Sequence, residues 1–179
     1  MRLTCIRHTK VAVPTGICYG QTDVPLAESY PSERLSVLQR VPDFEFDVVF
    51  SSPLQRCKLL TRDLFPEQIV VIDERLKELD FGDWENQSWD AIFQTNRGKH
   101  WMENYLEIPC PGGESYPEFR QRIISFLGEL KKDSFHQVAV VTHGGVIRLI
   151  KSILHDQSMD DVFASFSPEY GGIYEFELS

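Results

Sequence analysis

The sequence has few basic residues, no long apolar run and no paired cysteines. Its 179 residues include 18 lysines and arginines against 27 aspartates and glutamates, which gives a formal net charge of −9. This balance, without any basic cluster, argues against nucleic acid or an anionic membrane as a partner. No apolar stretch approaches the ~20 residues of a membrane span, and the N-terminus shows no signal-peptide pattern.

The cysteines lack any spacing that would pair them or hold zinc. No C-x-x-C pair occurs among the four, which are Cys5, Cys18, Cys57 and Cys110. Cys5 falls in an expected buried strand and Cys57 in an expected helix, where reduced thiols pack as small hydrophobic side chains. We therefore expect a cytoplasmic protein.

Motifs for nucleotides and metals are absent as well. Neither G-x-G-x-x-G nor G-x-x-x-x-G-K-[ST] occurs, which argues against a plain nucleotide-binding α/β protein. The histidines do not show close ligand spacing such as H-x-x-x-H, and arginines beside them would repel a cation. We expect neither a metal nor a cofactor.

What the sequence does contain is two short apolar runs that each end in a histidine. Residues 3–6 are followed by Arg7 and His8, and residues 138–142 are followed by His143. Such runs are typical of buried strands in a parallel sheet, and ligands of open α/β sheets bind beyond the carboxyl ends of the strands. One such histidine alone would suit an ordinary surface hydrogen bond. Two of them with neighbouring arginines predict a shared pocket.

The remaining pattern predicts one α/β domain over residues 1–179. Further strands are expected at 47–50, 69–72 and 171–178, with helices between most of them. The expected helices are 32–41, capped by Ser32; one starting at Ser52-Pro53; 86–101; 115–130, with a Ser115/Glu118 capping box; and one opening at Gly144-Gly145. The fold class is a three-layer sandwich with a mostly parallel central sheet and helices on both faces.

A long irregular segment, 9–27, follows the first strand. Segments of this length are uncommon in a compact domain unless they bind something, although an ordinary covering loop is the simpler interpretation of each residue singly. Its middle offers a hydroxyl, an amide and close backbone approach beside His8. The candidate substrate contacts are Thr9, Tyr19, Gly20 and Gln21 from this segment and Gly144 from the second motif.

Two more charged features belong with this pocket. Arg56 falls in the first turn of the helix after Ser52-Pro53, where a helix N-terminus favours an anion. The stretch 74–85 is rich in acids beside aromatic residues, an environment that can turn a carboxyl into a general acid. The residues alone leave the choice open among Glu74, Glu78, Asp80, Asp83 and Glu85.

Together these side chains indicate phosphoryl transfer. Two guanidinium groups have the fork geometry that binds phosphate oxygens, and a neutral imidazole among them can act as the nucleophile. Phosphoryl transfer asks mainly for in-line positioning and charge stabilisation. The expected partner is a small-molecule phosphate ester. Nothing in the sequence decides the oligomeric state.

Four motifs in order resemble the histidine phosphatase superfamily, the phosphoglycerate mutase-like branch 1. They are Ile6-Arg7-His8, Ser51-Ser52-Pro53-Leu54-Gln55-Arg56, the stretch 76–85, and Val141-Thr142-His143-Gly144-Gly145-Val146-Ile147-Arg148. The resemblance implies a phosphoglycerate mutase-like fold. It also implies that His8 takes the phosphoryl group while Arg7, Arg56 and His143 bind it.

The resemblance also selects Glu78 as the acid that protonates the leaving oxygen and later activates water. Two residues depart from the family pattern, which usually has glycine where Thr9 stands and commonly asparagine where Pro14 stands. These departures concern substrate contacts of the first loop rather than the catalytic set.

Within the superfamily, the short length and the stretch 18–26 are similar to the α-ribazole phosphatases. That similarity implies hydrolysis of α-ribazole 5′-phosphate in the assembly of the cobalamin nucleotide loop. The alternatives are a broad-specificity histidine phosphatase, a phosphoglycerate mutase, or a non-catalytic module that binds a phosphorylated ligand. Mutases of this type are larger, and a binding module would not need both His8 and Glu78.

Overall fold

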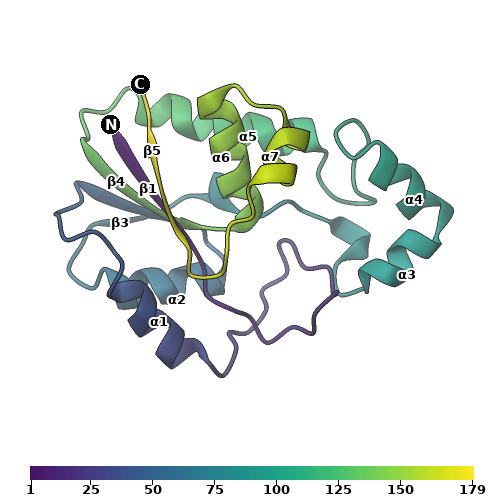
Figure 1. Cartoon of the computed structure of the whole chain (residues 1–179), viewed down its shortest axis with the longest axis horizontal. Helices are drawn as coiled ribbons and strands as arrows, with labels where there is room; N and C mark the ends of the chain where they lie inside the picture. Colours follow the sequence, from purple (N-terminus) through teal and green to yellow (C-terminus); the bar gives the residue numbers. More distant parts are fainter.

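The computed structural model describes all residues, 1–179, and is built around one five-stranded sheet. The strands run in the order β3-β2-β4-β1-β5 across the sheet (Figure 1). β5 pairs antiparallel with β1, and the other neighbours are parallel. The strand bounds are β1 Arg2–Arg7, β2 Val48–Ser51, β3 Val70–Ile72, β4 Gln137–Thr142 and β5 Ile173–Glu177.

Helices cover both faces of this sheet, so the predicted three-layer α/β architecture is confirmed. α1 and α2 lie on one side in Figure 1, α5, α6 and α7 lie on the other, and α3 and α4 are set apart beyond the sheet. The bounds are α1 Tyr30–Leu38, α2 Gln55–Leu64, α3 Trp89–Gln94, α4 Asn96–Glu103, α5 Tyr116–Leu130, α6 Gly144–His155 and α7 Met159–Ser165. None of them is long and apolar enough to cross a membrane.

The central strands β1 and β4 carry apolar side chains on both faces of the sheet. Along β1, Leu3 and Cys5 face the larger core under α5 and α6, while Ile6 faces the smaller core under α1 and α2. β4 alternates in the same way, with Val140 on one side and Val141 on the other. A strand buried on both faces reads as a continuous apolar run, because no side faces water.

The helix signals of α5 and α6 are confirmed. Ser115 and Glu118 form the expected reciprocal capping box at the start of α5. The apolar residues of α5 that recur at helical spacing are all buried: Phe119, Ile123, Phe126, Leu127 and Leu130. α6 opens at Gly144, directly after His143.

The helix predicted at 32–41 lies at Tyr30–Leu38 instead, so both of its predicted ends were wrong. The helix begins at Tyr30 after Ser29, so Ser32 lies inside it rather than at its cap. Only Val37 is buried, whereas Leu35 and Leu38 are about half exposed. Nothing packs over that side of the helix, and the apolar pattern alone could not show this.

Two other helix boundaries differ from the predictions. α2 starts at Gln55 rather than at Ser52-Pro53, because Leu54 still has extended backbone angles. The single helix expected at 86–101 is two helices, α3 and α4, which meet at Thr95. Thr95 has extended backbone, and its side chain accepts a hydrogen bond from Gly98 and so caps α4.

The predicted third strand exists but lies exposed at the edge of the sheet. Every residue of β3 has at least 38% of its surface exposed, and Ile69 just before it has 72%. Its apolar run therefore reflects high β-propensity rather than burial. This edge lies beside β2, on the far side of the sheet from β5.

Candidate active site

The carboxyl ends of β1, β4 and β2 bring three site side chains together. His8 follows β1 and donates its backbone N–H to Thr142 at the end of β4, at 3.0 Å. Ser52 follows β2 and donates its N–H to Val141, also at 3.0 Å. The rings of His8 and His143 lie 5.1 Å apart between centroids. The sheet order thus joins residues that are far apart in the sequence.

His8 is arranged with one ring nitrogen free. Its Nδ1 lies 2.7 Å from the backbone oxygen of Thr9, and because a carbonyl can only accept, Nδ1 carries the proton. Burial is the main reason that the pKa of His8 lies well below its ordinary value of 6.5, and the positive charge of Arg56 lowers it further. The ring is therefore neutral near pH 7, and Nε2 presents a lone pair.

Two arginines stand beside this imidazole, and protein carbonyls hold both of them. Arg7 donates Nη1 to Pro168 at 2.6 Å, and the fully buried Arg56 donates to Gly20 at 2.7 Å and Thr22 at 3.0 Å. The Nε–H groups of both arginines are buried without a protein partner. Each guanidinium therefore has a donor left for an anion.

His143 is fixed from the α2 side. Its Nε2 lies 2.8 Å from Ser52 Oγ and 3.5 Å from Cys57 Sγ. Burial raises the pKa of the Cys57 thiol to about 12, so the thiol stays protonated. Burial, Arg56 and His8 hold the pKa of His143 well below its ordinary value. This second imidazole is also neutral near pH 7.

Glu78 faces the same cavity from the acid-rich segment. Its two carboxylate oxygens accept backbone N–H groups of Leu79 and Gly145, each at 3.0 Å. A Cβ at Gly145 would overlap this carboxylate, which explains the glycine. The cavity has a volume of about 310 Å³, and its lining includes Arg7, His8, Arg56 and Glu78. A guanidinium pair, an imidazole and a carboxyl therefore meet at one opening.

The segment that carries Glu78 is held by a single arginine of α5. Arg122 donates to the backbone oxygens of Arg75, Lys77 and Glu78. It also forms a salt bridge with Glu114 at 2.7 Å. Residues 77–81 belong to no helix or strand, so these contacts of Arg122 fix the position of Glu78.

The loop 9–27 is tied to the acid segment by another carboxylate. Glu85 accepts the backbone N–H groups of Gln21 and Thr22, at 2.7 and 2.6 Å. The Gln21 side chain donates to the backbone oxygen of Glu78. A Cβ at Gly20 would overlap the carbonyl oxygen of Leu79, so the glycine permits this close approach.

Of the candidate substrate contacts, Tyr19 lines the cavity. Thr9, Gly20, Gln21 and Gly144 do not line it. Three of them contact side chains of the candidate catalytic set instead: Thr9 holds the His8 ring, Gly20 accepts from Arg56, and Gly144 packs against the Arg7 guanidinium. Gln21 donates to the backbone oxygen of Glu78.

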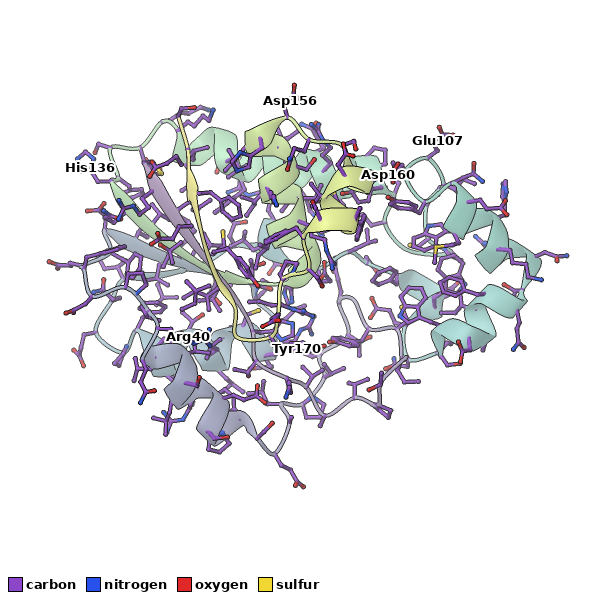
Figure 2. The ribbon with its side chains drawn as sticks, viewed as in Figure 1. Arg40, Glu107, His136, Asp156, Asp160 and Tyr170 are labelled. Carbon is purple, nitrogen blue, oxygen red and sulfur yellow. The ribbon has the colours of Figure 1, made fainter.

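Tyr170 was missed by the sequence analysis. It lies in the loop before β5, labelled in Figure 2, and its ring is 3.9 Å from the Arg7 guanidinium carbon and 5.6 Å from the His8 ring. Its hydroxyl hydrogen-bonds that of Tyr19, whose ring lies beside Arg56. Two tyrosines from opposite ends of the chain therefore flank Arg7 and Arg56. The sequence near Tyr170 gives no signal beyond the glycine pair that follows it.

The family model described as "Histidine phosphatase superfamily (branch 1)" matches residues 3–179 of this chain. The chain belongs to this superfamily. Its match spans all five strands described above, so the predicted family and the phosphoglycerate mutase-like fold are confirmed.

Relatives in the superfamily carry different phosphatase names. A protein of Hydrogenobacter thermophilus, provisionally named phosphoserine phosphatase 2, is 28% identical over 99% of this chain and 89% of its own length. The α-ribazole phosphatase of Shigella flexneri superposes with a TM-score of 0.91 at 24% identity, over 100% of this chain and 91% of its own. An Escherichia coli K-12 protein, provisionally named an α-ribazole-5′-P phosphatase, superposes with a TM-score of 0.89 at 26% identity, over 98% of this chain and 89% of its own.

Proposed function

We propose that this histidine phosphatase family member hydrolyses small-molecule phosphate monoesters through a phosphohistidine at His8. One observation carries the proposal: the Nδ1 proton of His8 is held by the Thr9 carbonyl, which leaves Nε2 free at a cavity shared with Arg7, Arg56 and Glu78. A neutral imidazole nitrogen between two cations is suited to attack a phosphorus atom.

The reaction has two displacements in this proposal. Nε2 of His8 forms a bond to phosphorus as the bond to the ester oxygen breaks, and Glu78 donates its proton to that leaving oxygen. Glu78 then takes a proton from a water molecule, whose oxygen displaces His8 and yields inorganic phosphate. Arg7, Arg56 and His143 hold the phosphoryl oxygens as charge redistributes.

We further propose α-ribazole 5′-phosphate as the substrate. The name of the 26% identical Escherichia coli structure supports it, as does the stretch 18–26. The phosphoserine name of the Hydrogenobacter relative favours a second candidate, a broad-specificity phosphatase of small esters. All four cysteines are free, which supports placing the enzyme in a reducing compartment such as the cytoplasm.

The test is steady-state hydrolysis, without added metal, of α-ribazole 5′-phosphate, O-phosphoserine, ribose 5-phosphate and 3-phosphoglycerate. His8→Ala is the catalytic variant, and His136→Ala, an exposed histidine labelled in Figure 2, is its matched control. A kcat/KM for α-ribazole 5′-phosphate at least ~100-fold above the others, about 2.7 kcal/mol of transition-state binding, supports the narrow assignment. Similar rates across the panel identify the broad phosphatase. Turnover that survives in His8→Ala overturns the mechanism.

A further inference from the structure

A second cavity opens beside the phosphate site and is lined only by hydrophobic side chains. Its volume is about 630 Å³. Five of its seven lining residues also line the phosphate cavity: Phe81, Trp89, Trp101, Tyr105 and Phe163. Phe93 and Met102 complete it. The two cavities therefore adjoin each other, so the leaving group of a molecule whose phosphate meets His8 would lie beside this space.

The cavity is built by elements outside the sandwich. α3 supplies Trp89 and Phe93, α4 supplies Trp101, and α7 supplies Phe163 from the other side. Figure 1 shows α3 and α4 set apart from the sheet. Trp101 is buried with Trp84 in the larger core, whereas Phe81, Trp89 and Phe93 are only partly buried against it.

The rings are arranged as flat walls. Trp89 is nearly parallel to Phe93, at 21° and 5.3 Å between centroids, and nearly parallel to Trp101, at 17° and 6.3 Å. Phe81 meets Trp89 edge-on at 84°. Parallel and edge-on aromatic faces bind a further planar ring well.

Hydrogen-bonding groups are scarce on these walls. The hydroxyl of Tyr105 already donates to Asp160 on α7, at 2.8 Å, and Asp160, labelled in Figure 2, is exposed. The ammonium and carboxylate of phosphoserine, or the hydroxyl groups of a sugar, would lose water here without gaining a partner. An aromatic ring with an apolar edge loses little.

We propose that this aromatic cavity is the leaving-group subsite and that it takes a planar aromatic group with an apolar edge, joined through a short polar linker to the phosphate. The inference deepens the proposed function and rests on it. The subsite selects among phosphate esters by the chemistry of the leaving group. α-Ribazole 5′-phosphate, whose base is 5,6-dimethylbenzimidazole, fits the subsite, while phosphoserine and adenosine monophosphate do not.

The experiment measures kcat/KM for α-ribazole 5′-phosphate, adenosine 5′-monophosphate and ribose 5-phosphate in the wild type and in Phe163→Ala and Phe93→Ala. Phe163 is 46% exposed, so its truncation leaves the core intact. Ile69→Ala, an exposed apolar residue before β3, is the matched control. The ratio of the α-ribazole ester to ribose 5-phosphate reports the base alone, because both esters present the same phosphate.

We expect this ratio to be about 100 or more in the wild type and to fall about tenfold or more in each phenylalanine variant, as loss of one stacked aromatic contact predicts. Turnover of ribose 5-phosphate should fall less than turnover of the α-ribazole ester in both variants, and Ile69→Ala should match the wild type. A wild-type ratio near 1, an unchanged ratio in both variants, or equal use of the adenine nucleotide overturns the inference.

A binding measurement separates this inference from the proposed function. 5,6-Dimethylbenzimidazole, the base without sugar or phosphate, should bind the wild type and His8→Ala equally in calorimetry and more weakly to Phe163→Ala. If the wild type binds the base as expected but turns over no ester in a His8-dependent way, the phosphatase proposal alone is refuted. Absence of base binding to the wild type, or binding that Phe163→Ala does not weaken, would refute the subsite.

Discussion

Replacing Glu78 by glutamine should slow hydrolysis of alkyl phosphates far more than hydrolysis of p-nitrophenyl phosphate. The carboxylate accepts one N–H on each oxygen, from Leu79 and Gly145. An amide keeps the shape and one acceptor but carries no acidic proton. General acid catalysis contributes about 10²–10⁴-fold, so we expect a loss near 10³-fold, about 4 kcal/mol, for an alkyl ester whose leaving oxygen needs a proton.

The assay is kcat/KM, which reports the steps up to formation of the phosphohistidine and is insensitive to the later attack by water. p-Nitrophenolate leaves as a stable anion, so its ester should lose less than about tenfold in Glu78→Gln. Glu74→Gln is the control, because Glu74 belongs to the same acidic segment and its side chain is 72% exposed. Equal losses for both esters would refute the assignment of Glu78 as the acid.

Three further predictions follow from the same contacts. The free energy of unfolding should fall as the pH drops below 6.5, because His8 and His143 then bind protons in the unfolded chain but stay neutral in the folded one. In acid titrations monitored by circular dichroism, the stability of His143→Asn should depend less steeply on pH than that of the wild type. Arg122→Ala should destabilise the protein by about 3 kcal/mol in urea unfolding, since it leaves a partly buried carboxylate unpaired, while the exposed Arg120→Ala should change stability by less than about 0.5 kcal/mol. Ser52→Ala should lower kcat/KM about tenfold through the lost hydrogen bond to His143, and Ser52→Thr should restore most of it; an unaltered Ser52→Ala enzyme would contradict this role.

The sequence predicts the centre of the sheet well because burial on both faces leaves a clear pattern. β1 and β4 are short apolar runs, which is typical of neighbouring parallel strands that are buried on both faces. The pattern fails where burial depends on distant neighbours. Leu35 and Leu38 have the spacing of a core face but remain about half exposed, and the apolar β3 is an exposed edge.

The site shows the same division between local and distant causes. Strand ends place Arg7, His8 and His143 at one rim, and sequence reasoning finds them. Choosing among the acids required the family resemblance. The structure shows why: Glu85 binds loop N–H groups while Glu78 faces the cavity.

Other roles depend on contacts that no local pattern encodes. Ser52, where the sequence predicts the start of a helix, contacts through its hydroxyl a histidine 91 residues away. Arg122 acts through carbonyls 44 to 47 residues earlier in the chain. Tyr170 acts through the first strand and the first loop.

The arginines of the phosphate site are held in place by protein carbonyls rather than by a substrate. Pro168 fixes Arg7, while Gly20 and Thr22 fix Arg56. Their charges therefore attract any phosphate dianion, whether or not an ester group is attached to it. In the proposed reaction, released orthophosphate should compete with fresh ester for the same two guanidinium groups, so we expect a prolonged reaction to slow through product inhibition that added substrate relieves.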